Sequence, residues 1–188
     1  MIKIGITGSL GSGKTTASKM LSFRRGPLFS ADKAVKELYQ NKKFKLVIEK
    51  RFKIKNNNQI KKSVKNLILK DIKNIKRLER IIHPLVRNKM RNFTSQNKNK
   101  KFLFYEIPLL IESKLMKYFN IVIFIKAKKQ LRLRRFQSKS GDKKLFNILN
   151  DKQMSDKNKI KYCDFVIVNE KNLNILKKNL LAIIDKYE

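Results

Sequence analysis

Residues 8 to 15 read Gly-Ser-Leu-Gly-Ser-Gly-Lys-Thr, which matches the phosphate-binding motif G-x-x-x-x-G-K-[ST] at every fixed position. Glycines let the backbone curl until its N–H groups converge on phosphate oxygens, and the start of a following helix adds a favourable dipole. Lys14 can then reach the β- and γ-phosphates of ATP, and the Thr15 hydroxyl can ligate Mg²⁺. The alternative, a plain Gly-rich turn, would not require Lys and Thr in sequence. We therefore expect the nucleotide to be bound by Gly11, Ser12, Gly13, Lys14, Thr15 and Thr16.

Two acidic residues follow apolar runs that we interpret as strands. Asp32 comes just after the second run, and ligands of parallel α/β sheets bind beyond the carboxyl ends of strands. Asp32 could accept or orient the proton of an attacking hydroxyl, or it could cap the helix that follows, and the sequence gives both readings equal weight. Glu106 closes the third run and could hold Mg²⁺ through water, or it could be an ordinary exposed acid.

His83 is the only histidine, and Arg87 lies four residues further on, so the two share one face of a helix. Together they could hold a substrate phosphate, or they could belong to a solvated face. As part of a His-Pro pair, His83 could equally cap and orient a turn. Because Pro84 is favoured in the first turn of a helix, we expect a helix to start there.

A dense cationic segment contains Arg132, Arg134, Arg135 and Lys139. In a kinase such a helix could be a lid, whose cations neutralise charge on the transferring phosphoryl group and whose closure excludes water. The alternative is a solvated helix face.

The elements that must position these residues alternate along the chain. Apolar runs predict five strands, and the segments between them have helical spacing or high charge. Asn56-Asn57-Asn58 predicts a turn, Ser140-Gly141 a break, and Thr94 to Lys101 a polar loop. This alternation predicts an α/β fold around a parallel sheet. The strands are expected at 2–7, 27–29, 102–106, 120–125 and 164–168, and the helical regions at 15–22, 33–92, 126–161 and 173–187.

The formal net charge is +33, from 47 Lys and Arg against 14 Asp and Glu. Nucleic-acid binding is the obvious reading, and a nucleic-acid-binding ATPase is therefore one alternative function. However, the chain has 37 Lys, 18 Asn and 22 Ile, a bias typical of AT-rich codons, and no aromatic residues are interleaved in an RNA-binding motif. We favour compositional drift plus a polyanionic small substrate.

The remaining features of the sequence concern compartment and cysteine chemistry. No apolar run approaches the roughly 18 residues that span a bilayer, and the N-terminus does not resemble a signal peptide. We expect a cytoplasmic protein with no membrane partner; the sequence does not predict its oligomeric state. The single Cys163 excludes an internal disulfide and is expected to be a small buried residue beside a strand.

Five segments in order along almost the whole chain resemble the dephospho-CoA kinase family. None of the later motifs is decisive alone, but five at suitable distances are hard to obtain by accident. They are GITGSLGSGKTTAS at 5–18, SADKAVKEL at 30–38, IIHPLVR at 81–87, EIPLLIESKL at 106–115 and CDFVIVN at 163–169.

The resemblance implies transfer of the γ-phosphoryl group of ATP to the 3′-hydroxyl of dephospho-CoA, which gives coenzyme A and ADP. It implies that Asp32 is the catalytic base, that Asn169 opens a loop near the adenine, and that Lys14, Arg135 and Lys139 act on the phosphates. It also implies a three-layer P-loop kinase fold, similar to nucleoside-monophosphate kinases, with a five-stranded parallel sheet. In that fold residues 1–188 form one domain, with a helical substrate-binding insertion at about 33–92 and a lid at about 130–157. Another nucleotide or nucleoside kinase of this fold is the nearest alternative.

The chain departs from the family pattern at several positions, among them the stretch near Lys61 and Lys62, where the family usually has an Arg. Ser30 stands where the family usually has an Asp, which leaves Asp32 in place in an altered neighbourhood. Lys139 stands where the lid commonly has a second arginine, and lysine keeps the charge but loses the planar bidentate fork. Which of Arg132, Arg134 and Arg135 takes the first lid position is left open by the sequence.

Overall fold

The structure is a computed structural model that describes residues 1–54, 59–139 and 141–188. The chain divides into two compact units, one formed by Met1–Ser30 with Gln96–Glu188 and one by Ala31–Ser95. The predicted turn at Asn56-Asn57-Asn58 and Ser140 of the predicted break lie outside the described residues.

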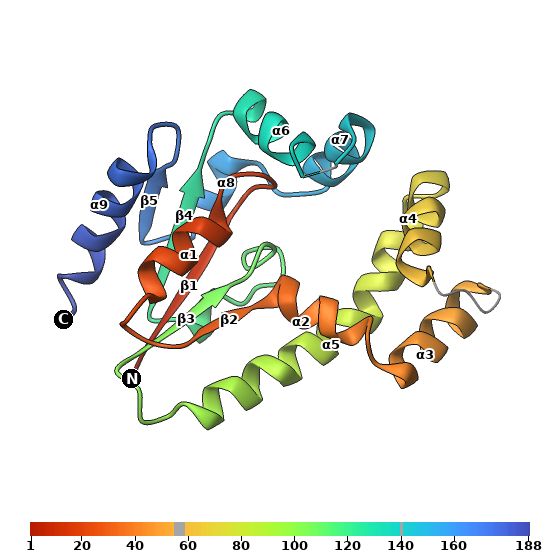
Figure 1. The fold of residues 1–188 in the computed structure, drawn as a ribbon, viewed down its shortest axis with the longest axis horizontal. Coiled ribbons are helices and arrows are strands. Elements are labelled where there is room, and N and C mark those ends of the chain that lie inside the picture. The colour runs from red at the N-terminus through yellow and green to blue at the C-terminus, as the bar shows by residue number, and fades with distance from the viewer. Residues whose placement is uncertain (55–58, 140) are drawn as a thin grey trace. The chain divides into compact units, whose positions relative to one another are not determined.

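The first unit is built on a five-stranded sheet of order β2-β3-β1-β4-β5 (Figure 1). Every pair of neighbouring strands is parallel, so the predicted α/β fold is confirmed. The predicted strands are also confirmed, with shifts of one residue at several ends. Their bounds are β1 Ile2–Gly8, β2 Leu28–Ser30, β3 Phe102–Glu106, β4 Ile121–Lys126 and β5 Phe165–Val168.

The central strands are apolar on both sides because both faces of the sheet are covered. On one face, Ile4 and Ile6 pack in a core with residues of α1 (Lys14–Ser22) and α9 (Leu173–Ile184). On the other face, a Cβ at Gly5 would meet side-chain atoms of Leu110 at 2.7 Å and Phe119 at 3.0 Å. Leu110 and Phe119 belong to the segment between β3 and β4, which also contains the 3₁₀ turn η1 (Met116–Tyr118). Parallel strands with helical crossovers leave their carboxyl ends, where ligands bind, at one edge of the sheet.

The described residues of the charged segment between β4 and β5 form three helices, α6 (Lys129–Gln137), α7 (Lys143–Asp151) and α8 (Asp156–Ile160). Gly141 lies between α6 and α7, near the predicted break. The sequence did not predict the second interruption, where Ser155 caps α8 by accepting a hydrogen bond from Asn158 N.

The second unit is helical, with α2 (Ala31–Leu38), α3 (Lys42–Phe52), α4 (Ile60–Lys70) and α5 (Lys73–Gln96, whose last residue belongs to the first unit). Helix α3 is capped by Asn41, whose side chain accepts from Phe44 N at 3.1 Å. The helices enclose a small core of their own, formed by Leu38, Phe44, Ile48, Phe52, Ile60, Val64 and Ile82.

The prediction that a helix starts at Pro84 is wrong, because Pro84 lies inside α5. An internal proline costs about 3 kcal/mol by removing a hydrogen bond and crowding the preceding turn. The buried face of α5 nevertheless continues across it, from Ile75 and Ile82 to Met90, and this packing keeps one continuous helix. The predicted loop at Thr94 is also helical at its start, since Thr94 Oγ1 donates to Met90 O at 2.9 Å within α5.

Cys163 was expected to be buried, but it is only half-buried, just before β5. Its thiol donates to Lys159 O at 3.3 Å. Burial, and to a lesser degree the neighbouring Asp164, raises the pKa of Cys163 to about 12. The thiolate is therefore scarce at neutral pH, and the residue is a packing group.

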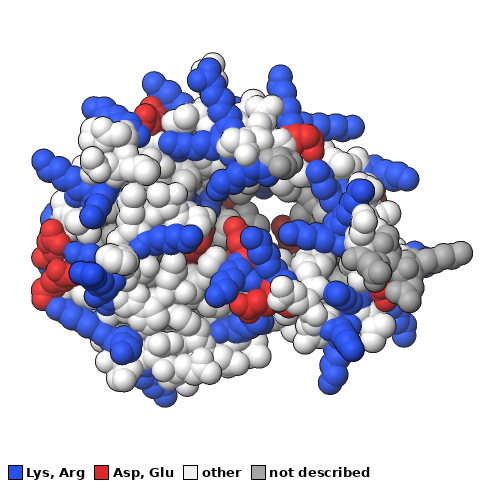
Figure 2. Space-filling view, viewed as in Figure 1, with Lys and Arg blue, Asp and Glu red and all other residues white. Residues whose placement is uncertain are grey.

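Lys and Arg side chains are spread over the face seen in Figure 2, with few Asp and Glu between them. Among the described residues, no helix combines the length and apolarity that a bilayer-spanning segment needs.

Candidate functional site

The glycine loop connects the end of β1 at Gly8 to the start of α1 at Lys14. Gly11 and Gly13 have positive φ angles of 77° and 93°, which residues with a side chain rarely adopt. A Cβ at Gly11 would also lie 2.4 Å from the backbone oxygen of Arg132. At Gly13 a Cβ would lie 2.2 Å from Asn169 Nδ2. Glycine is thus required at both positions by conformation and by space.

Lys14 and Thr15 follow the loop in the first turn of α1. Lys14 is buried, and its Nζ donates to the backbone oxygen of Ser9 at 3.0 Å. Thr15 Oγ1 donates to Glu106 Oε1 at 2.5 Å. Thr16 is exposed, one residue further along the helix.

Glu106 is not the ordinary exposed acid of the alternative reading, because only 2% of its surface is accessible. It is the last residue of β3 and pairs in register with Ile6 of β1 and Ser30 of β2. Parallel strand order therefore brings a carboxylate beside the loop that leaves β1. Since the Thr15 hydroxyl donates a hydrogen bond to Glu106, the lone pairs of its oxygen face away from that contact and can bind a hard cation such as Mg²⁺.

Asn169 and Arg135 both contact the backbone of the loop at Ser12. Asn169 Nδ2 donates to Ser12 O at 2.9 Å, and Arg135 donates to Ser12 O at 3.3 Å and to Asn169 O at 3.1 Å. Asn169 directly follows β5 and is buried. A side chain of α6 and the residue after β5 thus both hold the loop at Ser12.

The cationic helix is not a uniformly solvated face. Arg132 is 6% exposed and donates to Leu10 O, Asn150 Oδ1 and Ala127 O at 3.2, 2.8 and 3.2 Å. Burial lowers the pKa of Arg132, and the charge of Asp156 opposes that shift. By contrast, Arg134 and Lys139 are exposed, and Lys139 lies beyond the end of α6. Arg132 was among the lid candidates, but its structural hold on Leu10 was not predicted.

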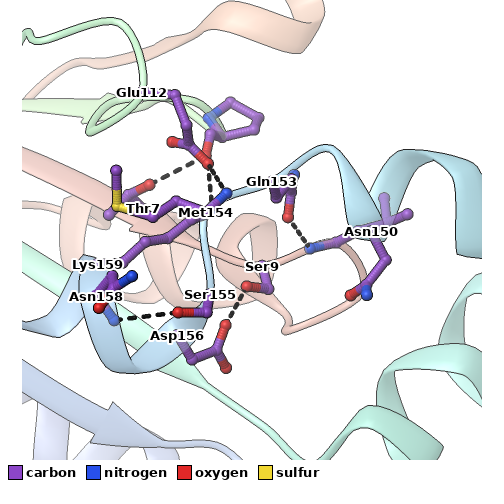
Figure 3. A network of polar contacts seen from close by, with 12 residues as sticks. Thr7, Ser9, Glu112, Asn150, Gln153, Met154, Ser155, Asp156, Asn158 and Lys159 are labelled. Carbon is purple, nitrogen blue, oxygen red and sulfur yellow. Dashed lines mark hydrogen bonds and ion pairs between the residues drawn. The ribbon is translucent and has the colours of Figure 1, made fainter. Parts of the chain in front are cut away.

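The segment between α7 and α8 supplies side chains that sequence reasoning missed. Gln153 Oε1 accepts from Leu10 N at 3.0 Å, and Asp156 accepts a short hydrogen bond from Ser9 Oγ (Figure 3). Lys159 pairs with Glu112 at 2.8 Å. Glu112 belongs to the EIPLLIESKL segment, but nothing in its spacing indicated this partner 47 positions along the chain.

The other predicted site residues belong to the second unit. Asp32 is exposed in the first turn of α2, where a carboxylate interacts favourably with the helix dipole. Since α2 begins at Ala31, Asp32 lies inside the helix and does not precede it as a cap. Arg87 is exposed on α5, one turn from the half-buried His83.

His83 is held neutral by its surroundings. Burial lowers its pKa most, Arg87 lowers it further, and the carboxylate of Glu79 partly offsets both. The imidazole is therefore uncharged at pH 7, and an anion bound beside it would favour the protonated form.

Comparison with known proteins identifies the family. Residues 2–174 match the family model described as dephospho-CoA kinase. A dephospho-CoA kinase from Rickettsia bellii is 35% identical over 189 residues, covering 100% of this chain and 98% of the relative.

Two solved structures agree with this match. TT1252 from Thermus thermophilus has a TM-score of 0.81 at 27% identity, covering 100% of this chain and 98% of that one. The dephospho-CoA kinase from Campylobacter jejuni has a TM-score of 0.68 at 26% identity, covering 98% and 96%. The family match, together with a loop built to bind phosphate, shows that this chain belongs to the dephospho-CoA kinase family and is an ATP-dependent kinase.

Proposed function

We propose that the protein transfers the γ-phosphoryl group of ATP to the 3′-hydroxyl of dephospho-CoA in one direct, in-line step. The bond from the γ-phosphorus to the β–γ bridging oxygen breaks, and a bond to the 3′-oxygen forms. The hydroxyl proton passes to the Asp32 carboxylate, and ADP leaves with the bridging oxygen. The observation that carries this proposal is the family match over residues 2–174.

The loop and its neighbours bind the triphosphate. Lys14 Nζ, which donates to Ser9 O beside the loop, contacts the β- and γ-phosphates of ATP. Arg135 and Asn169 hold the loop at Ser12, and the adenine of ATP lies near Asn169, which directly follows β5. Most of the rate enhancement then comes from positioning and from fixed positive charge.

Thr15 and Glu106 would hold Mg²⁺, Thr15 directly and Glu106 through water. Their 2.5 Å contact supports this assignment, because hydroxyl and carboxylate oxygens are the ligand types that Mg²⁺ prefers. When bound, the ion supplies charge neutralisation on the phosphate oxygens.

The helical second unit binds the acceptor through His83 and Arg87, and Lys139 acts from the lid on the transferring phosphoryl group. The neutral His83 becomes a cation beside an anionic phosphate, while Arg87 is permanently charged.

Asp32→Asn tests the role of the base. Loss of the proton acceptor is expected to lower kcat by about 10²- to 10⁴-fold, while ATP affinity changes little. Steady-state kinetics with ADP release as the signal measure both quantities. An unchanged kcat would remove Asp32 from the mechanism.

A panel of acceptors tests the substrate assignment. ADP release is expected with dephospho-CoA and not with nucleoside monophosphates, nucleosides or RNA. Phosphorylation of a nucleoside monophosphate with dephospho-CoA inert would indicate a different kinase of the same fold. ATP hydrolysis stimulated by RNA, without acceptor phosphorylation, would indicate a nucleic-acid-dependent ATPase.

A further inference from the structure

Three side chains at a spacing of three residues, Gln153, Asp156 and Lys159, each make a polar contact with the glycine loop or with Glu112 (Figure 3). We call them the brace. Gln153 accepts from the backbone N–H of Leu10, and Asp156 accepts from the hydroxyl of Ser9. Two residues of the brace therefore contact Ser9 and Leu10, which follow Gly8 at the start of the loop.

Ser9 is the junction between the brace and Lys14. Its backbone oxygen accepts from Lys14 Nζ at 3.0 Å and from Ser12 N at 3.1 Å, while its side chain donates to Asp156. Ser9 is only 3% exposed, so solvent cannot easily replace these partners. The position of the ammonium group of Lys14 thus depends on a residue that Asp156 holds.

Lys159 connects the brace to Glu112, which lies in the segment after β3. Its side chain is fully buried and pairs with Glu112 Oε1 at 2.8 Å, and the same oxygen accepts from Met154 N at 3.2 Å. Glu112 lies six residues after Glu106, in the segment whose Pro108 oxygen accepts from Thr7 Oγ1 at 3.1 Å. One short stretch of chain is therefore fastened both to the glycine loop and to the segment that follows the proposed Mg²⁺ carboxylate.

We infer that Gln153 and Asp156 are positioning residues for ATP, which act through Leu10 and Ser9 to hold the loop in its phosphate-binding shape, and that Lys159 anchors them. The inference rests on the proposed function only in that the loop binds ATP; it does not depend on the acceptor. Because Gln153 accepts from the N–H of Leu10, that group already has a partner within the protein.

The charge of Asp156 provides a way to separate positioning from simple electrostatics. A carboxylate beside an anion-binding loop repels the triphosphate, so electrostatics alone predicts tighter ATP binding when the charge is removed. Positioning predicts that the hydrogen bond matters: Asp156→Asn keeps an acceptor for Ser9 Oγ, whereas Asp156→Ala does not.

The test measures ATP dissociation constants by calorimetry and KM values by ADP release for Asp156→Ala, Asp156→Asn, Gln153→Met and Gln153→Glu. We expect Asp156→Ala and Gln153→Met to weaken ATP binding by about tenfold, the order of one lost hydrogen bond to a charged or buried group. Asp156→Asn, which retains an acceptor, should stay within about threefold of the wild type. Gln153→Glu retains the acceptor but adds a carboxylate beside the loop, so it should lose less ATP affinity than Gln153→Met without fully matching the wild type. The KM for dephospho-CoA should change little in all four variants. Asp185→Ala, an exposed acid on the end of α9, is the control for loss of one carboxylate.

Several results would overturn the inference. One is wild-type ATP affinity in both Asp156→Ala and Gln153→Met, even if their melting temperatures fall, since the contacts would then be purely structural. Another is tighter binding in Asp156→Ala and Asp156→Asn alike, which would leave only the charge. If Asp156→Ala does not fold, Gln153→Met and Ser9→Ala make the same comparison from the other partners. Failure of the wild type to phosphorylate dephospho-CoA would contradict the proposed acceptor, but the calorimetric test would still decide the role of the brace.

Discussion

Alanine at position 13 is expected to damage ATP binding through two separate effects that the structure makes distinct. The residue would have to adopt a φ angle of 93°, and the left-handed region costs a residue with a side chain about 1–2 kcal/mol. Its Cβ would also lie 2.2 Å from Asn169 Nδ2, so the 2.9 Å hydrogen bond from that atom to Ser12 O must break, at about 1 kcal/mol. Together these effects correspond to roughly a 30- to 150-fold loss of ATP affinity.

A second substitution separates the two effects. Asn169→Ala alone removes the hydrogen bond and is expected to weaken ATP binding by about fivefold. In the double variant the steric conflict disappears and the hydrogen bond is already lost. Its ATP affinity should therefore be no worse than that of Gly13→Ala, so that the two changes are strongly non-additive.

Calorimetric titration with ATP measures all three variants, and urea unfolding controls for loss of the fold. Losses that multiply in the double variant would refute the claim that Gly13 and Asn169 act through one contact. Wild-type affinity in Gly13→Ala would contradict the requirement for glycine itself.

Three further predictions concern other parts of the molecule. Glu112→Gln removes the charged partner of the fully buried Lys159 and should lower the free energy of unfolding in urea by about 3–5 kcal/mol. Lys128→Met, which removes an exposed ion pair with Glu170, is the control and should lower it by less than about 1 kcal/mol. Equal losses in the two variants would contradict the argument from burial. Burial and Arg87 lower the pKa of His83 below 6.5, so the unfolded chain binds more protons at this residue just below that pH, and the free energy of unfolding should fall on acidification in this range. His83→Gln should flatten this pH dependence. Dephospho-CoA should raise the pKa of His83 in an NMR titration of this single histidine, and the absence of a shift would remove His83 from the acceptor site. Glu106→Gln should raise the Mg²⁺ concentration for half-maximal activity by about 10- to 100-fold, and an unchanged requirement would exclude Glu106 from the metal site.

The local parts of the site could be predicted from the sequence, because their signals are local. The glycine loop is one continuous motif, and its flanking strand and helix are adjacent in the chain. Strand alternation then indicated that Glu106 ends a strand. Whether Glu106 is exposed could not be predicted, since its burial depends on the order of strands in the sheet and on Thr15, 91 positions away.

The supporting contacts could not be predicted for the same reason. Ser9 and Asp156 are 147 positions apart, and Arg132 and Leu10 are 122 apart, so no periodicity relates them. Nothing in the sequence distinguishes Arg132 from the other cations of its helix, whereas in the structure it is buried and donates to Leu10 O of the loop. Pro84 was misread because local helix-start rules ignore the continuous buried face of α5, which tertiary packing favours.

The central claim, phosphoryl transfer from ATP to dephospho-CoA, is tested most directly by identifying the product. The purified protein is incubated with ATP, Mg²⁺ and dephospho-CoA, and the reaction is followed by ³¹P NMR. We expect a new phosphate monoester on the 3′-oxygen of the ribose, formed in equal amount to ADP and absent in Lys14→Ala. ADP formed together with free inorganic phosphate, while dephospho-CoA remains unchanged, would contradict the claim.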